Sequence, residues 1–139
     1  MTVLLLLAGL FTTVLGLVHF VMPKLFDFEN AIPRSGTSLK PLKIFFYKYN
    51  TTRSDIRGIA SVMNHSVSFT WVTIGWLDLL SRHWRGTEAG VWIAGWISLW
   101  WFLRASCQFY LGHRRGDWFV FFWFMVLGVL HLTAAAHEF

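Results

Sequence analysis

Seven polar side chains interrupt long apolar stretches of this chain, and they are the residues whose types could perform chemistry. Five of them are expected at similar depth in the molecule: His19, Asn64, His65, Arg104 and Gln108. Neutral imidazole is a common ligand of haem, chlorophyll-type pigments and metals, and arginine can hold a phosphate, a carboxylate or a quinone carbonyl. The five residues are therefore candidates for a ligand-binding cluster. The alternative is that they satisfy one another, with Arg104 stacking on Trp100 or Trp101.

Asp78 and His131 form a second group, because they are expected in the opposite half of the molecule from the five-residue cluster. A carboxyl and an imidazole in this arrangement could share a hydrogen bond and hold or relay a proton. A structural role satisfied by water is the other interpretation. Two groups without a continuation into the first cluster do not make a path across a membrane, so the sequence does not indicate a transporter.

Aromatic residues are the third conspicuous feature, with nine tryptophans and fourteen phenylalanines. Tryptophan gathers at membrane–water interfaces, but several tryptophans lie deeper than an interfacial belt explains. Deep, bulky aromatic side chains suit contact with lipids, pigments or the helices of a partner, and packing inside the molecule is the competing interpretation. The predicted aromatic contact face consists of Trp92, Trp96, Trp100, Trp101 and Trp123.

The elements that must position these residues are four apolar runs at 2–22, 59–81, 89–111 and 118–136. A helix of about 20 apolar residues matches the ~30 Å hydrocarbon core of a bilayer. The chain is 55% hydrophobic and 14% charged, whereas soluble domains carry about 25% charged residues. The sequence predicts an all-α integral membrane protein, a single domain over 1–139 that forms an antiparallel four-helix transmembrane bundle.

Small and weakly polar residues recur at helical spacing and predict the faces on which the helices meet. On the first run these are Gly9, Thr12, Gly16 and His19. On the second run they are Ser61, Asn64, Ser68, Trp71, Gly75 and Asp78, and on the fourth Gly128, His131 and Ala135. The polar candidates therefore belong to the predicted interior.

The distribution of Lys and Arg predicts the orientation. The loops 23–58 and 112–117 hold nine of these residues, and the opposite side holds two, Arg82 and Arg85. By the positive-inside rule both basic loops face the cytoplasm, and both termini face outward, most simply across a bacterial inner membrane. The net charge of +5 is then explained by orientation and anionic lipid, and nucleic acid is not a predicted partner. The first run lacks a basic leader and a cleavage site, so we expect it to be retained.

The sequence does not favour catalysis, because it shows no nucleophile beside a base, no paired carboxylates and no phosphate-binding glycine loop. Cys107 is the single cysteine and makes no internal disulfide. We therefore expect a non-catalytic accessory subunit of a larger membrane complex, of respiratory or photosynthetic type, that packs on partner helices, lipids or pigments. The alternative is a self-sufficient membrane protein that binds haem, a quinone, a pigment or an anionic lipid through His19, His65 and Arg104.

Overall fold

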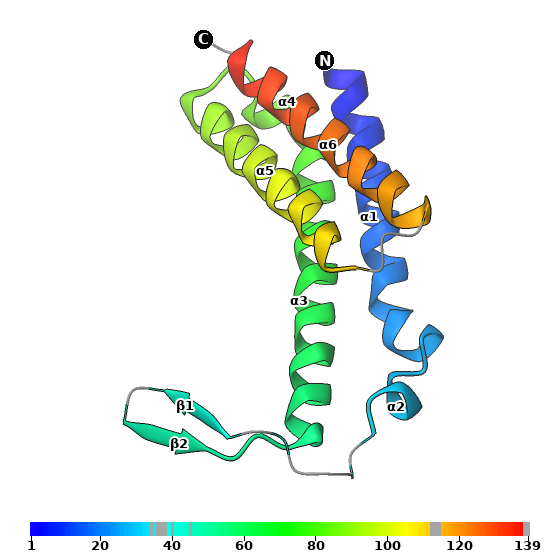
Figure 1. Cartoon of the computed structure of the whole chain (residues 1–139). Coiled ribbons are helices and arrows are strands. Elements are labelled where there is room, and N and C mark those ends of the chain that lie inside the picture. The colour runs from blue at the N-terminus through cyan, green and yellow to red at the C-terminus, as the bar shows by residue number, and fades with distance from the viewer. Residues whose placement is uncertain (34, 36–38, 40, 45, 112–114, 138–139) are drawn as a thin grey trace. The chain divides into compact units, whose positions relative to one another are not determined.

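The fold is all-α apart from one short hairpin, as a computed structural model of the chain shows (Figure 1). The structure describes residues 1–33, 35, 39, 41–44, 46–111 and 115–137. The long helices are α1 (Thr2–Leu25), α3 (Arg53–Leu79), α5 (Glu88–Ser106) and α6 (Arg115–Ala136). The short elements are α2 (Phe28–Ala31), β1 (Leu42–Ile44), β2 (Tyr47–Tyr49), α4 (Ser81–Trp84) and the 3-10 helix η1 (Cys107–Tyr110).

The first and fourth predicted runs lie within α1 and α6. The second and third runs extend beyond their long helices: α3 ends at Leu79, and α5 ends at Ser106. The helix α3 begins at Arg53, so residues 53–58, expected in the basic loop, are helical. The cause is local: Thr52 Oγ1 accepts a hydrogen bond from the Asp55 backbone N–H, and the Asp55 carboxylate accepts from the Thr52 N–H. This reciprocal cap starts the helix before the apolar run. At the end of the third run, α5 gives way to η1 after Ser106.

The loop between α1 and α3 also contains an antiparallel pairing of β1 with β2, in which Leu42 faces Tyr49 and Ile44 faces Tyr47. Three of the basic residues that predicted the orientation, Arg34, Lys40 and Arg114, lie outside the described residues.

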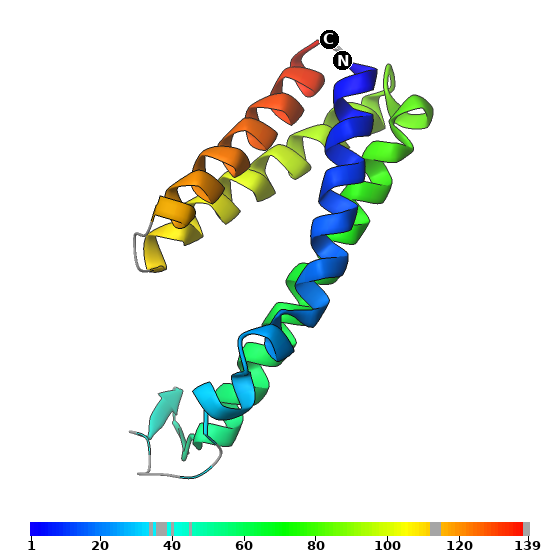
Figure 2. The same ribbon diagram turned by 90° about the vertical axis from the view of Figure 1, so that its right-hand side faces the viewer.

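The chain divides into two compact units, which are described separately. The first unit comprises residues 1–11 and 74–139, and its main element is the antiparallel pair of α5 and α6 (Figures 1 and 2). Ser98 Oγ of α5 donates a hydrogen bond of 2.8 Å to the Gly128 carbonyl of α6. A side chain on Gly128 would lie 2.7 Å from the Phe102 ring, so a residue without one allows the two helices to approach this closely.

The turn from α3 to α5 in the first unit is fixed by side-chain hydrogen bonds. Trp84 Nε1 donates to the Leu77 carbonyl at 2.8 Å, and Thr87 caps α5 by accepting from the Gly90 N–H at 3.0 Å. Gly86, between these residues, has a φ of 74°, a conformation that glycine adopts without steric cost.

The second unit, residues 12–73, contains the remainder of α1, α2, the hairpin and most of α3. Its two long helices pack closely, because a side chain on Gly16 would lie 2.9 Å from the backbone nitrogen of Val72 and 3.0 Å from the Ser68 carbonyl. The Asn64 amide donates a hydrogen bond of 3.0 Å to the His19 carbonyl. Glycine and small polar residues thus bring α1 and α3 together here, as the sequence pattern predicted.

Two helices, α1 and α6, are long and apolar enough to cross a membrane. The core helix of a soluble protein can be equally long and apolar, but it is mostly buried. Only 28% of the apolar segment of α1 and 33% of that of α6 is buried. A signal sequence near the N-terminus can have the same length and composition. The helices α3 and α5 do not reach the same hydropathy, so the four-helix transmembrane bundle stays a prediction.

Candidate functional site

The predicted inward faces are buried in the structure. Gly9, Thr12 and Gly16 of α1 are buried, as are five positions of α3 and three of α6: Asn64, Ser68, Trp71, Gly75, Asp78, Gly128, His131 and Ala135. His19 and Ser61, which belong to the same predicted faces, are half-buried. The spacing of small and weakly polar residues therefore correctly predicted most of the buried positions on these faces.

Asp78 and His131 form the most enclosed polar contact in the first unit. His131 Nε2 lies 2.9 Å from Asp78 Oδ1, and both side chains are 0% exposed. The two residues are 53 positions apart and come from α3 and α6, so this contact joins two helices.

The second nitrogen of His131 determines how protons are arranged in this pair. His131 Nδ1 lies 2.7 Å from the Leu127 carbonyl, which can only accept, so Nδ1 carries a hydrogen. The contact between Nε2 and Oδ1 then needs one further proton, held either by the imidazole or by the carboxyl. In both arrangements the pair has no net charge, which is the inexpensive state for groups removed from water.

Two buried oxygen atoms in this part of the first unit have no hydrogen-bond partner among the described residues, namely the second carboxyl oxygen of the pair, Asp78 Oδ2, and Ser81 Oγ. Ser81 lies one turn beyond Asp78 and is 0% exposed. A side chain on Gly9 would lie 2.8 Å from Asp78 Cβ and 2.8 Å from the Gly75 carbonyl, so α1 packs closely against α3 at Asp78. The pair can hold a proton, and its surroundings keep it from solvent.

The candidate ligand-binding residues are divided between the two units. His19, Asn64 and His65 belong to the second unit, and Arg104 and Gln108 belong to the first. The expected convergence of all five residues therefore stays a prediction, and each set is described where it lies.

In the second unit, His19 lies against α3. Its Nδ1 is 3.3 Å from Ser68 Oγ, and its ring centroid is 4.7 Å from that of Trp71. Ser68 Oγ already donates to the Asn64 carbonyl at 2.7 Å, so it accepts from His19, and the hydrogen of a neutral His19 is on Nδ1.

His65 is exposed, and its Nδ1 lies 2.7 Å from the Ser61 carbonyl of the preceding turn. Because that carbonyl accepts, Nδ1 donates, and the lone pair of the neutral ring is on Nε2. This nitrogen is the atom that could bind a metal or the iron of a haem. Among the residues that the structure describes, no three His, Cys, Asp or Glu side chains gather as a metal site.

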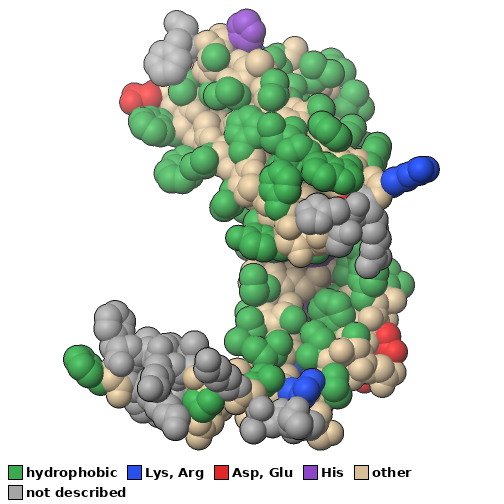
Figure 3. Space-filling model, in the orientation of Figure 1, with side chains coloured by type: hydrophobic (Ala, Val, Ile, Leu, Met, Phe, Trp, Pro, Cys, Tyr) green, Lys and Arg blue, Asp and Glu red, His purple; other side chains and the backbone are tan. Residues whose placement is uncertain are grey.

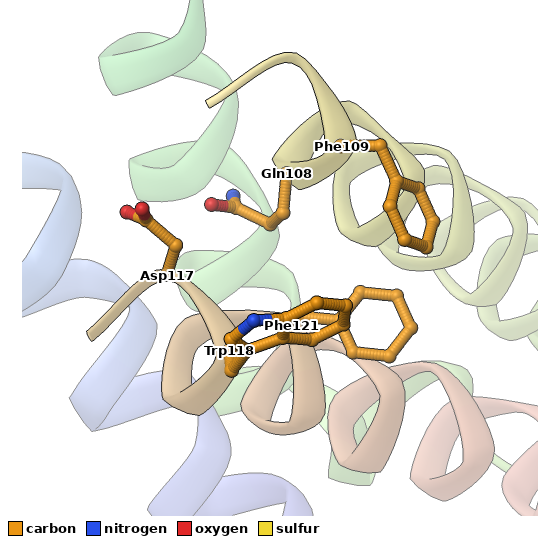
Figure 4. A pocket seen from close by; sticks show the side chains of 5 residues that line it. All are labelled: Gln108, Phe109, Asp117, Trp118 and Phe121. Atoms are coloured by element: carbon orange, nitrogen blue, oxygen red, sulfur yellow. The ribbon is translucent and has the colours of Figure 1, made fainter. Parts of the chain in front are cut away.

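In the first unit, Arg104 is half-buried, and its guanidinium carbon lies 5.4 Å from the centroid of the Phe124 ring. Phe124 is therefore an aromatic partner that the sequence did not identify, since Trp100 and Trp101 had been expected in this role. Gln108 is buried and lines a small cavity of about 10 Å³, the size of one water molecule. Figure 4 shows its amide on the same side of the cavity as the Asp117 carboxylate, with the rings of Phe109, Trp118 and Phe121 on the other.

The predicted aromatic contact face is only partly exposed. Trp92 is 64% and Trp96 is 66% exposed, whereas Trp100 and Trp123 are half-buried. Trp101 is 0% exposed and packs 5.2 Å from Phe124, so its assignment to an outward face was wrong. Trp101 follows Trp100 by about 100° around the helix, which turns it from the flank into the interior.

The exposed stripe of α5 continues with aliphatic residues, and α6 carries a similar stripe. The members on α5 are Trp92, Trp96, Leu99 and Leu103, and those on α6 are Phe119, Phe122, Val126, Val129 and Leu132. Apolar side chains cover much of the face of these two helices that Figure 3 shows. Soluble monomers rarely expose apolar surface that is this continuous.

An open groove in the second unit was not foreseen from the sequence. It lies where α2 approaches the beginning of α3 and is lined by Lys24, Asp27, Phe28, Glu29, Arg57 and Ser61, among others. Arg57 Nη2 and Glu29 Oε1 form an ion pair of 2.5 Å. The charges of 23–58 predict orientation, but no local signal predicts the pairing of Glu29 with Arg57, which are 28 positions apart.

Comparisons with models of protein families, with curated proteins and with solved structures found no match to this chain.

Proposed function

We propose that the chain is an integral membrane protein with four spanning helices and both termini outward, and that it serves as a non-catalytic accessory subunit of a larger membrane complex. One observation carries the proposal: polar side chains share the interior with apolar ones, while many large apolar side chains lie on the outside. Asp78, His131, Ser98 and Ser68 are buried, whereas all four long helices carry large apolar side chains that are exposed. This distribution is stable in a bilayer and unfavourable in water.

The role of a subunit is supported by the depth of the exposed tryptophans. Trp96 lies roughly 12 Å along α5 from Glu88, beyond the interfacial layer in which lipid-facing tryptophans concentrate. Its indole N–H would find no acceptor in lipid tails, whereas a partner helix can offer one. Leu99 and Leu103 extend the same exposed stripe and provide the apolar contact around it.

Three experiments test the proposal. Alkaline carbonate should leave the native chain in the membrane pellet, and reporter domains fused to each terminus should be active on the outer side. Purification from native membranes in mild detergent should recover larger subunits together with the chain, and Trp96→Ala should weaken that association without reducing insertion. Release by carbonate would contradict the membrane placement, and recovery of the chain alone would contradict the role as a subunit.

The second candidate function is that of a self-sufficient binder of haem, a chlorophyll-type pigment, a quinone or an anionic lipid. The observation in its favour is the exposed His65 ring, whose Nδ1 is engaged by Ser61 and whose Nε2 has the lone pair. An absorption spectrum and mass spectrometry of the purified protein distinguish the two functions. A stoichiometric chromophore that is lost in His65→Ala would favour the binder.

A further inference from the structure

We propose that the groove in the second unit binds a headgroup that carries both a phosphate and a primary ammonium, as phosphatidylethanolamine does. The groove has a volume of about 420 Å³ and opens between the end of α1, the short helix α2 and the first turns of α3. It therefore has room for a headgroup of this size.

The charges of the groove have both signs. Lys24 and Arg57 contribute two cations, and Asp27 and Glu29 contribute two carboxylates. The carboxylates disfavour a ligand with only negative charge, such as phosphatidylglycerol, and the cations disfavour one with only positive charge. A zwitterion places its phosphate near Lys24 and Arg57 and its ammonium near Asp27 and Glu29.

Arg57 is the most enclosed of these charged groups. Its side chain is 15% exposed, and its guanidinium donates to the carboxylate and the backbone carbonyl of Glu29. A guanidinium has five N–H donors, so these two contacts leave others for a phosphate. The Glu29 side chain is 78% exposed and can turn toward an ammonium without breaking buried contacts.

Asp27, which lines the groove, has an unusual backbone conformation. Its φ is 48° and its ψ is 52°, which is left-handed, and its carboxylate accepts a hydrogen bond of 2.7 Å from the Asn30 amide. Aspartate adopts this conformation more readily than most residues because its side chain bonds locally. The turn thus fixes one carboxylate where α1 ends.

The position of the groove along α1 favours a lipid as the source of the headgroup, and this step rests on the proposed membrane placement. The apolar run of α1 ends just before Lys24, at the level where headgroups begin. Val21 and Leu25 are exposed and offer apolar surface beside the groove for acyl chains. Phosphatidylcholine would bind less well, because its quaternary ammonium has no N–H to donate to Asp27 or Glu29.

Native mass spectrometry of the full chain in detergent tests the proposal with equimolar phosphatidylethanolamine, phosphatidylglycerol and phosphatidylcholine of identical acyl chains. We expect about tenfold preferential retention of the ethanolamine lipid, and its loss in Arg57→Gln, in line with removal of a charge-assisted hydrogen bond. Glu29→Gln should remove the preference for ethanolamine over choline. Arg82→Gln, at an exposed cation of the first unit, is the matched control and should bind like the native chain.

Lys24→Gln provides a second variant at an exposed position, should Arg57→Gln fail to fold by circular dichroism. Equal retention of phosphatidylglycerol, or native retention in both Arg57→Gln and Lys24→Gln, would overturn the proposal. A titration with free phosphoethanolamine distinguishes a lipid ligand from a soluble one. If phosphoethanolamine binds as tightly as the lipid, the groove recognises the headgroup chemistry, and its ligand is a soluble compound. Carbonate release would refute the membrane placement alone, because the phosphoethanolamine titration still tests the groove.

Discussion

Two acid–base pairs of similar geometry occupy opposite environments in this protein. Asp78 and His131, in the first unit, approach to 2.9 Å and are fully buried. Glu29 and Arg57, in the second unit, approach to 2.5 Å, but the glutamate side chain is 78% exposed. Distance alone would rank the second pair as the stronger, yet removal from water determines what the loss of a partner costs.

The comparison separates a pair that holds helices together from a pair that is free to exchange partners. If one member of the buried pair is removed, the other is left without a partner and without water. If Glu29 is removed from the second pair, water replaces its carboxylate, because that side chain is 78% exposed. The same difference makes the groove around Arg57 suitable for a ligand and makes the surroundings of Asp78 suitable for holding one proton.

The largest effect is expected from His131→Ala, which leaves the Asp78 carboxyl buried and alone. We expect a loss of about 3 kcal/mol in the free energy of unfolding, measured by chemical denaturation in detergent micelles. Asp78→Asn should cost less than about 1 kcal/mol, because the amide nitrogen can donate to His131 Nε2 in place of the shared proton. If both variants lose the same free energy of unfolding, the Asp78–His131 contact depends on ionic charge. Both acid–base contacts would then be salt bridges.

The next effect concerns the helix that packs against α3 at Asp78. Gly9→Val would place side-chain atoms within contact distance of Asp78 Cβ and the Gly75 carbonyl, and we expect a destabilisation of about 1–3 kcal/mol. Gly95→Ala is the control, because nothing lies within 4 Å of a side chain at that position, and it should stabilise α5 by about 0.5–1 kcal/mol. Equal effects of the two substitutions would show that the approach of α1 is not needed to enclose Asp78.

Substitution of two buried serines tests whether the hydroxyl of Ser81, which has no partner among the described residues, contributes to stability. Ser98→Ala removes the hydrogen bond to the Gly128 carbonyl and should cost about 1 kcal/mol. Ser81→Ala removes a buried hydroxyl without a partner among the described residues and should be neutral or slightly stabilising in the same unfolding measurement. A clear destabilisation by Ser81→Ala would instead indicate a buried water between Ser81 and Asp78.

The smallest effect is expected at the exposed pair. Glu29→Gln should change the free energy of unfolding by less than about 1 kcal/mol, and raising the salt concentration should reduce the difference further. Comparison of the native chain and the variant at low and high salt checks this expectation. A cost as large as that of His131→Ala would remove the distinction between the two pairs.

The sequence predicted the positions of the long helices because apolar runs and helical spacing are local signals. The spacing of Gly9, Gly16, Ser68 and Asp78 also predicted their burial, since small residues permit close packing wherever helices meet. The sorting of residues by depth placed Asp78 and His131 in the same half of the molecule before their contact was known. This shared depth made a contact between Asp78 and His131 foreseeable, although they are 53 positions apart. The geometry of their hydrogen bonds could not be predicted.

The spacing of apolar and small residues did not predict the start of α3, the burial of Trp101 or the groove. The early start of α3 follows from the cap between Thr52 and Asp55, which lies outside the apolar run. Trp101 was assigned to the outward face with Trp100, although consecutive helical residues point in different directions. The groove depends on the approach of α2 to Arg57, and no periodic pattern links Glu29 to that residue.

The shared proton of Asp78 and His131 has an electrical consequence under the proposed membrane placement. A membrane potential acts on net charge, with about 2.3 kcal/mol for each elementary charge carried across 100 mV. The pair has no net charge whether the proton resides on the carboxyl or on the imidazole, so a transfer of the proton between them displaces charge only over the length of one hydrogen bond. The potential therefore exerts almost no force on this contact, and the junction between α3 and α6 stays equally strong in energised and de-energised membranes.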